Sequence, residues 1–336
     1  MNEGELVIHL RIKGPEIHDV TISSTRPVHA ARALVGRAAN DVARLVPLLF
    51  PVCGVAQSVA CSRALDASLD RAEDPEHERA RELATLAEAV ASHIWQLALT
   101  WREAAGAPAH PILVREARVA AERIRAALLI HREWDAVRRE ADRLAALVGQ
   151  IEVEGNPLLE IVARSGHAAL GWTASIATTR TLDPDEVGAR LADDPTFAER
   201  PTQWGRPVDV SAHDAGPGAT LLARLEARRD DAIACLERLR NLDVAPPSRV
   251  RTVVAGGGVG VAMTARGPLV HFARTRGDRV EDLRVVAPTE WTFHPAGILR
   301  EALVGAKLGD DVERVARWMV IALDPCVPYR IEVGDA

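Results

Sequence analysis

The strongest constraint on the fold is a long region of helical periodicity in the middle of the chain. Residues 78–105 and 112–151 carry apolar side chains at spacings near 3.6, the repeat of one helix face. The second stretch would run ~50–60 Å at ~1.5 Å per residue if it formed one unbroken helix. Helices of this length suit a bundle, so we predict a helical bundle at the centre of the molecule. The apolar positions of the second stretch are Val119, Ile124, Leu128, Trp134, Val137, Leu144 and Leu147.

Strand patterns flank this helical region on both sides. Residues 5–12 and 17–23 alternate well enough for two strands, and Lys13-Gly14-Pro15 between them is typical of a hairpin connection. Four more strands are expected near 250–255, 259–265, 268–274 and 280–287. The pattern predicts an α+β fold, mainly α, in which a helical bundle core carries small antiparallel sheets formed by the N-terminal and C-terminal segments.

Shorter helices complete the pattern. They are expected from about 28 to Pro51, and at 55–69, 184–192, 219–241, 297–306 and 309–322. Between 183 and 220 the sequence is otherwise rich in Pro, Gly, Asp and Thr, which favours loops. We predict one domain over residues 1–336, with N-terminal strands at 5–23, a helical core at 28–241 and a C-terminal strand and metal-motif region at 248–336.

Composition excludes several classes of protein. A chain of 336 residues with 48% hydrophobic side chains can bury a sizeable core, and its net charge of −6 gives no electrostatic case for nucleic acid. No apolar run approaches the ~20 residues of a membrane helix, so no membrane insertion is expected. The start, Met1-Asn2-Glu3-Gly4-Glu5, lacks the features of a signal peptide. Four irregularly spaced cysteines favour reduced thiols and a cytoplasmic location.

Two patterns at first suggest ligand sites, a phosphate loop and a zinc site, but neither has the residues that such a site requires. The run Gly256-Gly257-Gly258-Val259-Gly260 looks like a phosphate loop, but it lacks the Lys-Ser/Thr pair and no helix follows it. A flexible or closely packed strand junction is the favoured interpretation. The eleven histidines include no His-x3-His helical pair, so zinc hydrolase chemistry has no support.

Cys53 and Cys326 stand near opposite ends of the chain, each in half of a metal motif. Each resembles a Cys-x-x-Cys pair whose second cysteine is replaced, by Ala56 and by Tyr329 respectively. A thiolate is a soft ligand that suits iron, nickel or zinc. Cys53 would lie at the start of a helix, where free N–H groups and the helix dipole lower the pKa of a thiol. The other two cysteines, Cys61 and Cys235, are expected to be buried and inert.

Five segments, in order, resemble motifs of the large subunit of nickel–iron hydrogenases. The family's motifs are E-G-H-L-R-I, R-x-C-G-x-C, A-P-R-G-x-L-x-H, V-A-P-T-T-W and D-P-C-x-x-C. The matching segments here are Val7–Ile12, Phe50–Gln57, Thr264–His271, Val286–Trp291 and Leu323–Tyr329. The match is clear over about residues 5–70 and 250–330. In that family four cysteines hold a nickel and an iron that carries two cyanides and one carbon monoxide.

The resemblance implies roles for five residues. Cys53 and Cys326 match metal ligands of one site and should therefore lie close in space. Arg266 matches an arginine that points at one cyanide; without the resemblance it would be taken for a surface arginine at a strand end. Thr289 matches a hydroxyl residue that donates to the other cyanide, and Pro288 matches part of the apolar wall around carbon monoxide.

Departures from the motifs indicate a particular branch of the family. Val7 replaces the proton-relaying glutamate, Pro51 an arginine, Ala60 a histidine, and Glu332 the terminal histidine, and the cleavable tail of a hydrogenase precursor is expected to be absent. The chain thus resembles the non-catalytic hydrogenase expression or maturation proteins of the HupK/HoxV type. The implied role is not enzymatic: a scaffold that transiently holds the Fe(CN)2(CO) unit, receives it from a small maturation chaperone and passes it to the hydrogenase large subunit. Nickel is not expected.

Two alternatives remain open at the level of sequence. One is a divergent hydrogenase-like redox subunit that works with an iron–sulfur partner, which the lost thiolates and glutamate disfavour. The other is a metal-free structural paralogue, which the retained cysteines disfavour. In the family the first cysteine of each pair binds nickel alone. The two remaining thiolates must therefore turn to iron, or a partner must help to hold it.

Overall fold

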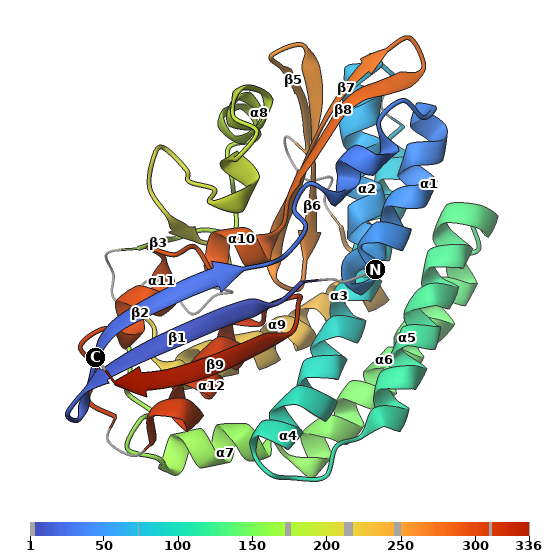
Figure 1. Ribbon diagram of the computed structural model, residues 1–336. Coiled ribbons are helices and arrows are strands. Elements are labelled where there is room, and N and C mark those ends of the chain that lie inside the picture. The colour runs from blue at the N-terminus through green and yellow to red at the C-terminus, as the bar shows by residue number, and fades with distance from the viewer. Residues whose placement is uncertain are drawn as a thin grey trace.

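Four long helices form the bundle predicted for the middle of the chain (Figure 1). The computed structural model describes residues 4–72, 74–171, 176–211, 218–244, 250–308 and 311–335. In the bundle, α3 packs against α5 and α9, and α6 packs against the same two helices. Their bounds are α3 Pro75–Trp95, α5 Pro111–Ala126, α6 Trp134–Glu154 and α9 Leu221–Asn241.

The predicted helix over 112–151 is wrong as a single element, because the chain folds back in its middle. A π-helical turn at Ala127–His131 ends α5, and Arg132 then adopts a left-handed conformation with φ of 57°. The N–H of Glu133 donates to the carbonyl of Ala127 and closes the turn at 2.9 Å. The stretch 78–105 is likewise interrupted by a π-helical turn, after which α4 spans Trp101–Ala104. The helix α7, Pro157–Arg164, was not predicted.

Less of the segment from 28 to Pro51 is helical than predicted. It consists of a 3-10 turn at Ala30–Leu34 and the helix α1, Ala39–Leu49. Gly36, with φ of 84°, separates the two, and its N–H donates to the carbonyl of Val280 at 2.8 Å. Because this contact attaches the loop to a strand of the C-terminal sheet, the chain cannot continue as helix there.

A four-stranded antiparallel sheet carries the glycine run. Its order is β5-β6-β7-β8, with bounds β5 Arg251–Val254, β6 Gly257–Thr264, β7 Gly267–Arg276 and β8 Arg279–Val286. Helix α2, Gly54–Ser68, lies directly on β6. A Cβ atom on Gly258 would lie 2.0 Å from the carbonyl oxygen of Ala64, and one on Gly260 would lie 2.1 Å from that of Ala60. The glycines are therefore a closely packed strand–helix junction, as expected.

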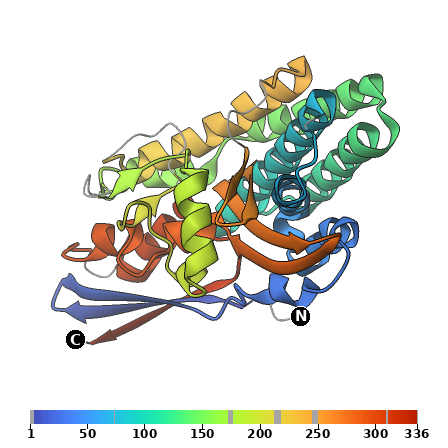
Figure 2. The ribbon, with the colours of Figure 1, turned by 90° about the horizontal axis from the view of Figure 1, so that it is seen from above.

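A second sheet joins the two ends of the sequence. Strands β2, Glu16–Ser24, and β1, Leu6–Lys13, are antiparallel, but β9, Tyr329–Asp335, pairs with β1 in parallel (Figure 2). The expectation of antiparallel sheets is thus wrong for this strand. The N–H of Leu6 donates to the carbonyl of Pro328 at 2.9 Å, so the starts of β1 and β9 lie side by side and both strands run the same way.

Short elements complete the fold, among them α8, which packs on β5, β6 and β7. Two-residue strands β3 and β4 pair in parallel, and the short helix α10 was not predicted. The predicted helices near 184–192, 297–306 and 309–322 are confirmed as α8, α11 and α12, and residues 309–310 lie outside the described part of the chain. The bounds are β3 Ala177–Thr178, α8 Pro184–Asp193, β4 Val208–Asp209, α10 Pro288–Thr292, α11 Ile298–Leu303 and α12 Val312–Leu323.

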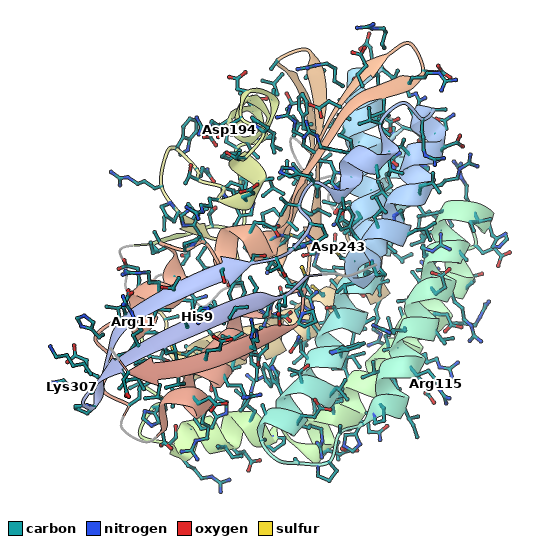
Figure 3. The ribbon with its side chains drawn as sticks, viewed as in Figure 1. His9, Arg11, Arg115, Asp194, Asp243 and Lys307 are labelled. Carbon is teal, nitrogen blue, oxygen red and sulfur yellow. The ribbon has the colours of Figure 1, made fainter. Side chains whose placement is uncertain are left out.

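Charged side chains of both signs are spread over the exterior, among them the labelled Arg11, Arg115, Asp194 and Lys307 (Figure 3). Within the described ranges, no single helix combines the length and apolarity needed to cross a membrane. Only α1 and the segment Pro51–Ser68 pass that test together, and they are bent by 105°. The single-domain organisation remains a prediction.

Candidate metal-binding site

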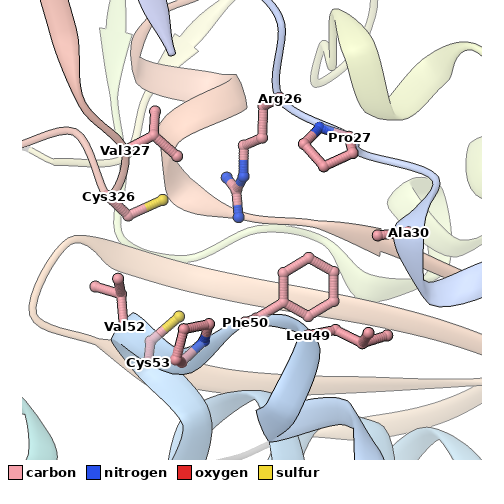
Figure 4. Close-up of a pocket in the computed structure, with 10 residues that line it drawn as sticks. Arg26, Pro27, Ala30, Leu49, Phe50, Val52, Cys53, Cys326 and Val327 are labelled. Carbon is pink, nitrogen blue, oxygen red and sulfur yellow. The ribbon is translucent and has the colours of Figure 1, made fainter. Parts of the chain in front are cut away.

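Cys53 and Cys326 line the same pocket, as the resemblance implied (Figure 4). Cys53 immediately precedes α2, and Cys326 lies in the loop between α12 and β9. Both sulfurs point into a hollow that is open to solvent. The lining residues are Arg26, Pro27, Ala30, Leu49, Phe50, Pro51, Val52, Cys53, Cys326 and Val327.

Cys53 is held by the start of α2. A 3-10 turn at Pro51–Cys53 leads into the helix, and the Glu88 carboxylate on α3 accepts the first N–H groups. These are the N–H groups of Val55 at 2.8 Å and Ala56 at 3.0 Å. Glu88 therefore does for α2 what an N-cap side chain ordinarily does, but from another helix.

The pKa of the Cys53 thiol is raised to about 12, mainly by burial and further by the charges of Cys326 and Glu88. The predicted lowering at a helix start is wrong. The Glu88 carboxylate accepts hydrogen bonds from the N–H groups of Val55 and Ala56, and Cys53 is only 7% exposed. The amide of Gln57 donates to Cys53 Sγ at 3.6 Å and opposes the rise. Gln57 is itself oriented by His271 Nε2, 2.8 Å from its carbonyl oxygen, and burial lowers the pKa of His271 to about 3.

The second cysteine is anchored by Asp324. This residue ends α12 in a left-handed conformation, with φ of 53°, and is 2% exposed. Its carboxylate accepts hydrogen bonds from Arg228 Nη1 at 3.0 Å, from Arg266 Nη2 at 3.2 Å and from the Gln96 amide. A buried carboxylate with three donors holds the start of the Asp-Pro-Cys segment in place.

Thr289 contacts Cys326 directly. Its hydroxyl donates to Cys326 Sγ at 3.0 Å and accepts the backbone N–H of Cys326 at 3.1 Å. Pro288, the first residue of α10, is buried beside it. The structure therefore brings a motif hydroxyl onto a motif sulfur, although 37 residues separate them in sequence.

Arg266 lies beside Cys326 but is turned toward Asp324. It is 8% exposed, its Nε donates to the carbonyl oxygen of Asp324 at 3.2 Å, and its Nη1 to Ser92 Oγ at 3.1 Å. Burial alone would lower the pKa of Arg266. The charges of Asp324, Cys326 and Cys53 outweigh burial and raise it, so the side chain stays charged. The interpretation as a surface arginine is excluded.

Sequence reasoning missed Arg26 and Glu290. Arg26 lines the pocket and pairs with Glu290 through Nη1 and Oε1 at 2.6 Å, and the two side chains are 8% and 7% exposed. One signal was present: Glu290 stands where the V-A-P-T-T-W motif has its second threonine. A new acidic residue inside a motif calls for a cationic partner.

The replaced motif residues have structural partners of their own. Ala60 is fully buried under Gly260, and Val7 is buried in β1. Glu332 Oε2 on β9 lies 2.8 Å from His9 Nδ1 on β1; Figure 3 labels His9 on this sheet. Tyr329 lines a different hollow, beside Trp318 on α12, so it does not fill the position of a lost cysteine in the pocket.

Cys61 and Cys235 are buried, as predicted. Two potential metal ligands lie near Cys235: ligand atoms of His93 and Asp231 are within 4.8 Å of its sulfur and of each other. Arg180 Nη1 lies 3.1 Å from Asp231 Oδ1, so a protein cation already balances this carboxylate. Burial raises the pKa of Cys235 to about 12, which keeps it a neutral thiol.

Solved hydrogenases share this architecture. The nickel–iron–selenium hydrogenase of Desulfovibrio vulgaris Hildenborough superposes with a TM-score of 0.65 over 94% of each chain, at 15% identity. That of Desulfomicrobium baculatum gives 0.62, at 14% identity, over 94% of this chain and 95% of that one. The protein therefore has the fold of the nickel–iron hydrogenase large subunits.

Sequence relatives narrow the class further. A hydrogenase expression/formation protein HupK of Rhizobium leguminosarum is 31% identical over 100% of this chain and 98% of its own length. HupK of Azotobacter vinelandii is 31% identical over 99% of both chains, and HoxV of Cupriavidus necator is 26% identical over 94% and 93%. No established model of a protein family matches the chain. The chain belongs to the HupK/HoxV/HupV family of hydrogenase expression/formation proteins.

Proposed function

We propose that this member of a hydrogenase maturation family is a scaffold that transiently holds an Fe(CN)2(CO) unit at Cys53 and Cys326. The observation that carries the proposal is that two cysteines from distant parts of the chain face one pocket. A hydroxyl donor on Cys326 Sγ supports it, as does a buried arginine beside that cysteine. Soft thiolate ligands with nearby donors suit low-valent iron with anionic diatomic ligands.

The donor set around the two cysteines suits the charge of this cargo. Iron(II) with two cyanides and two thiolates carries a formal charge of −2, which requires cations and hydrogen-bond donors in a dry site. Arg266, with its raised pKa, supplies a permanent cation, and Thr289 supplies a hydroxyl.

The same residues argue against nickel and against hydrogen turnover. The side chains of Ala56 and Tyr329 provide no thiolate, so only two of the family's four remain. Val7 cannot relay protons as a glutamate does. The protein would therefore act as an accessory binding protein in the cytoplasm and not as an enzyme.

Two missing thiolates also leave coordination positions on the iron open. A cysteine of a small maturation chaperone could enter there to deliver the unit, and a cysteine of the hydrogenase large subunit could enter to remove it. Fewer protein ligands mean weaker retention than in a four-thiolate site, which suits transfer.

Infrared spectroscopy of the protein purified from a hydrogenase-producing host tests this proposal. We expect substoichiometric iron with cyanide and carbon monoxide bands, lost in Cys53→Ala and in Cys326→Ala and retained in the matched control Cys61→Ala. Arg266→Leu should weaken the bands by leaving a cyanide charge unpaired. Wild-type bands in both site variants would exclude these thiols as ligands. If the wild-type protein carried no iron at all, the metal-free structural paralogue would be the better description.

A further inference from the structure

Arg26 is the cation that lies on the pocket wall itself. In Figure 4 its side chain descends from the segment after β2 toward the space that the sulfurs of Cys53 and Cys326 also face. We propose that Arg26 is a second anion-binding residue of this pocket, and that Glu290 is the positioning residue that aims it. The ligand it would take is a small anion held between the two cysteines, such as one cyanide of the iron unit. In naming that ligand, the inference rests on the proposed function.

The backbone of Arg26 is fixed in place. Its N–H donates to Ser24 Oγ at 3.2 Å, and its carbonyl accepts from the N–H of Val28 at 2.9 Å. Gly4 packs directly on it: a Cβ atom on Gly4 would lie 2.5 Å from Arg26 Cα. An arginine held this closely at its backbone presents its side chain in a defined direction.

Glu290 is fixed as firmly as Arg26. Its Oε1 takes the Arg26 bond at 2.6 Å, and its Oε2 accepts the N–H of Ala287 at 2.9 Å, at the start of α10. One turn of α10 therefore contacts both Cys326 and Arg26, through Thr289 and Glu290 respectively. This chain departs from the hydrogenase motif at Glu290, so the pair is a feature of this chain and not of that motif.

The Arg26 side chain retains both charge and donors for a ligand. Burial alone would lower its pKa, but the charges of Cys326, Glu290 and Cys53 raise it, so it stays a cation. A guanidinium carries five N–H donors in a planar fork, and the bond to Glu290 engages Nη1. Further donors can therefore reach an anion in the pocket.

Arg26 and Arg266 approach the cysteines from different sides. Arg266 contacts Asp324, two residues before Cys326, whereas Arg26 lines the hollow opposite Phe50. Each cation is held by a carboxylate before any ligand arrives: Arg26 by Glu290, and Arg266 by Asp324, which Arg228 also contacts. What the two arginines offer an anion is therefore N–H donors in fixed positions, since the carboxylates offset much of their charge.

Alkylation of the iron-free, full-length protein tests the role of Arg26 without any iron unit. The probes are iodoacetate, an anion, and iodoacetamide, its neutral analogue, and the readout is the ratio of their rates at Cys326 by peptide mass mapping. Both reagents attack the same thiolate, so the ratio cancels thiolate content and reports the local attraction for an anion. We expect Arg26→Gln to lower the ratio about threefold to tenfold and Glu290→Gln to raise it. Arg26→Lys should retain most of it.

The matched control is Arg44→Gln, which removes an exposed arginine from α1 and should leave the ratio unchanged. Opposite effects of the two site variants cannot arise from a shared loss of structure, and alkylation of the buried Cys61 reports any unfolding. Equal ratios in wild type, Arg26→Gln and Glu290→Gln would overturn the inference. If the ratios respond but the wild type never shows cyanide bands, the anion site stands and the proposed cargo fails.

Discussion

The two cysteines face one pocket from opposite environments. Cys53 is buried at the start of α2, next to the Glu88 carboxylate, and the pKa of its thiol is raised to about 12. Cys326 is half-buried in a loop, with the hydroxyl of Thr289 on its sulfur and an arginine-bound Asp324 two residues before it. Each sulfur thus has one side-chain donor, Gln57 at 3.6 Å on Cys53 and Thr289 at 3.0 Å on Cys326, but burial and Glu88 favour the neutral thiol at Cys53.

If the two cysteines bind iron as proposed, this difference implies an order of binding. A metal must displace a proton from each thiol that it binds, and displacement is harder where burial and a carboxylate disfavour the thiolate. Cys326, the more accessible residue, would then bind first, and Cys53 would follow once the charge of the metal offsets its surroundings.

The largest expected effect is a loss of stability on the Cys326 side of the site. Asp324→Ala leaves Arg228, which is fully buried, without the carboxylate it contacts at 3.0 Å. We expect the free energy of unfolding to fall by about 3–5 kcal/mol, as measured by urea denaturation. Asp135→Ala, on an exposed position of α6, should change it by less than about 0.5 kcal/mol. A loss below about 1 kcal/mol for Asp324→Ala would show that this carboxylate does not anchor the loop.

A second variant disturbs the Cys53 side by displacing α2, the helix that Cys53 precedes. In Gly260→Ala the new Cβ would lie 2.1 Å from the Ala60 oxygen and 2.4 Å from the Ala64 nitrogen, both backbone atoms of α2. Moving the helix should cost about 2–4 kcal/mol of stability. Gly149→Ala makes the same chemical change in α6, where the new Cβ would meet no atom beyond the adjoining backbone of its own helix within 4 Å, and should stabilise by up to about 1 kcal/mol. Similar urea midpoints for both variants would refute the close α2–β6 contact.

Glu88 gives the Cys53 side a pH dependence. Burial raises the pKa of this carboxyl from 4.5 to about 7, against the opposing N–H groups of Ala56 and Val55. The folded state thus binds the proton more tightly, and this stabilisation is present below pH 4.5 and lost as pH rises through about 7. Glu88→Gln should remove a loss of about 2 kcal/mol across that window. If wild type and variant differ in unfolding free energy by the same amount at pH 5 and pH 7.5, Glu88 does not titrate there.

The smallest effect sharpens the contrast between the thiols themselves. At pH 8, iodoacetamide should alkylate Cys326 at least about tenfold faster than Cys53, because Cys53 is 7% exposed and the pKa of its thiol is far above that pH. Mass mapping of the partly modified protein measures both rates. Equal rates would mean that the two environments do not differ as described.

Local patterns predicted local structure well. The strands predicted at 5–12 and 17–23 and the helix predicted at 55–69 are confirmed as β1, β2 and α2. The turn at Arg132 was missed, because a single left-handed residue leaves the apolar period on both sides intact. The pairing of β9 was missed because its partner, β1, lies at the other end of the sequence.

The site was predictable only in part. Cys53, Cys326, Arg266, Pro288 and Thr289 came from a resemblance of motifs. The structure places the two cysteines on one pocket, Thr289 on Cys326, and Arg266 on Asp324. Arg26 and Glu290 are separated by 264 residues, and neither has a local pattern that names the other. Such a pair is specified by the fold, so it becomes visible only when the fold is known.

The parallel pairing of β9 with β1 also sets a time at which the protein can begin to work. Ribosomes add roughly 5–20 residues per second, so β1 and Cys53 emerge tens of seconds before Cys326 and β9. Until Cys326 and Val327 are made the pocket lacks one wall, and until β9 is made β1 lacks one of its two neighbours. If the pocket receives cargo as proposed, a chain can do so only after translation has passed Val327, and β9 then fixes that end of the chain beside β1.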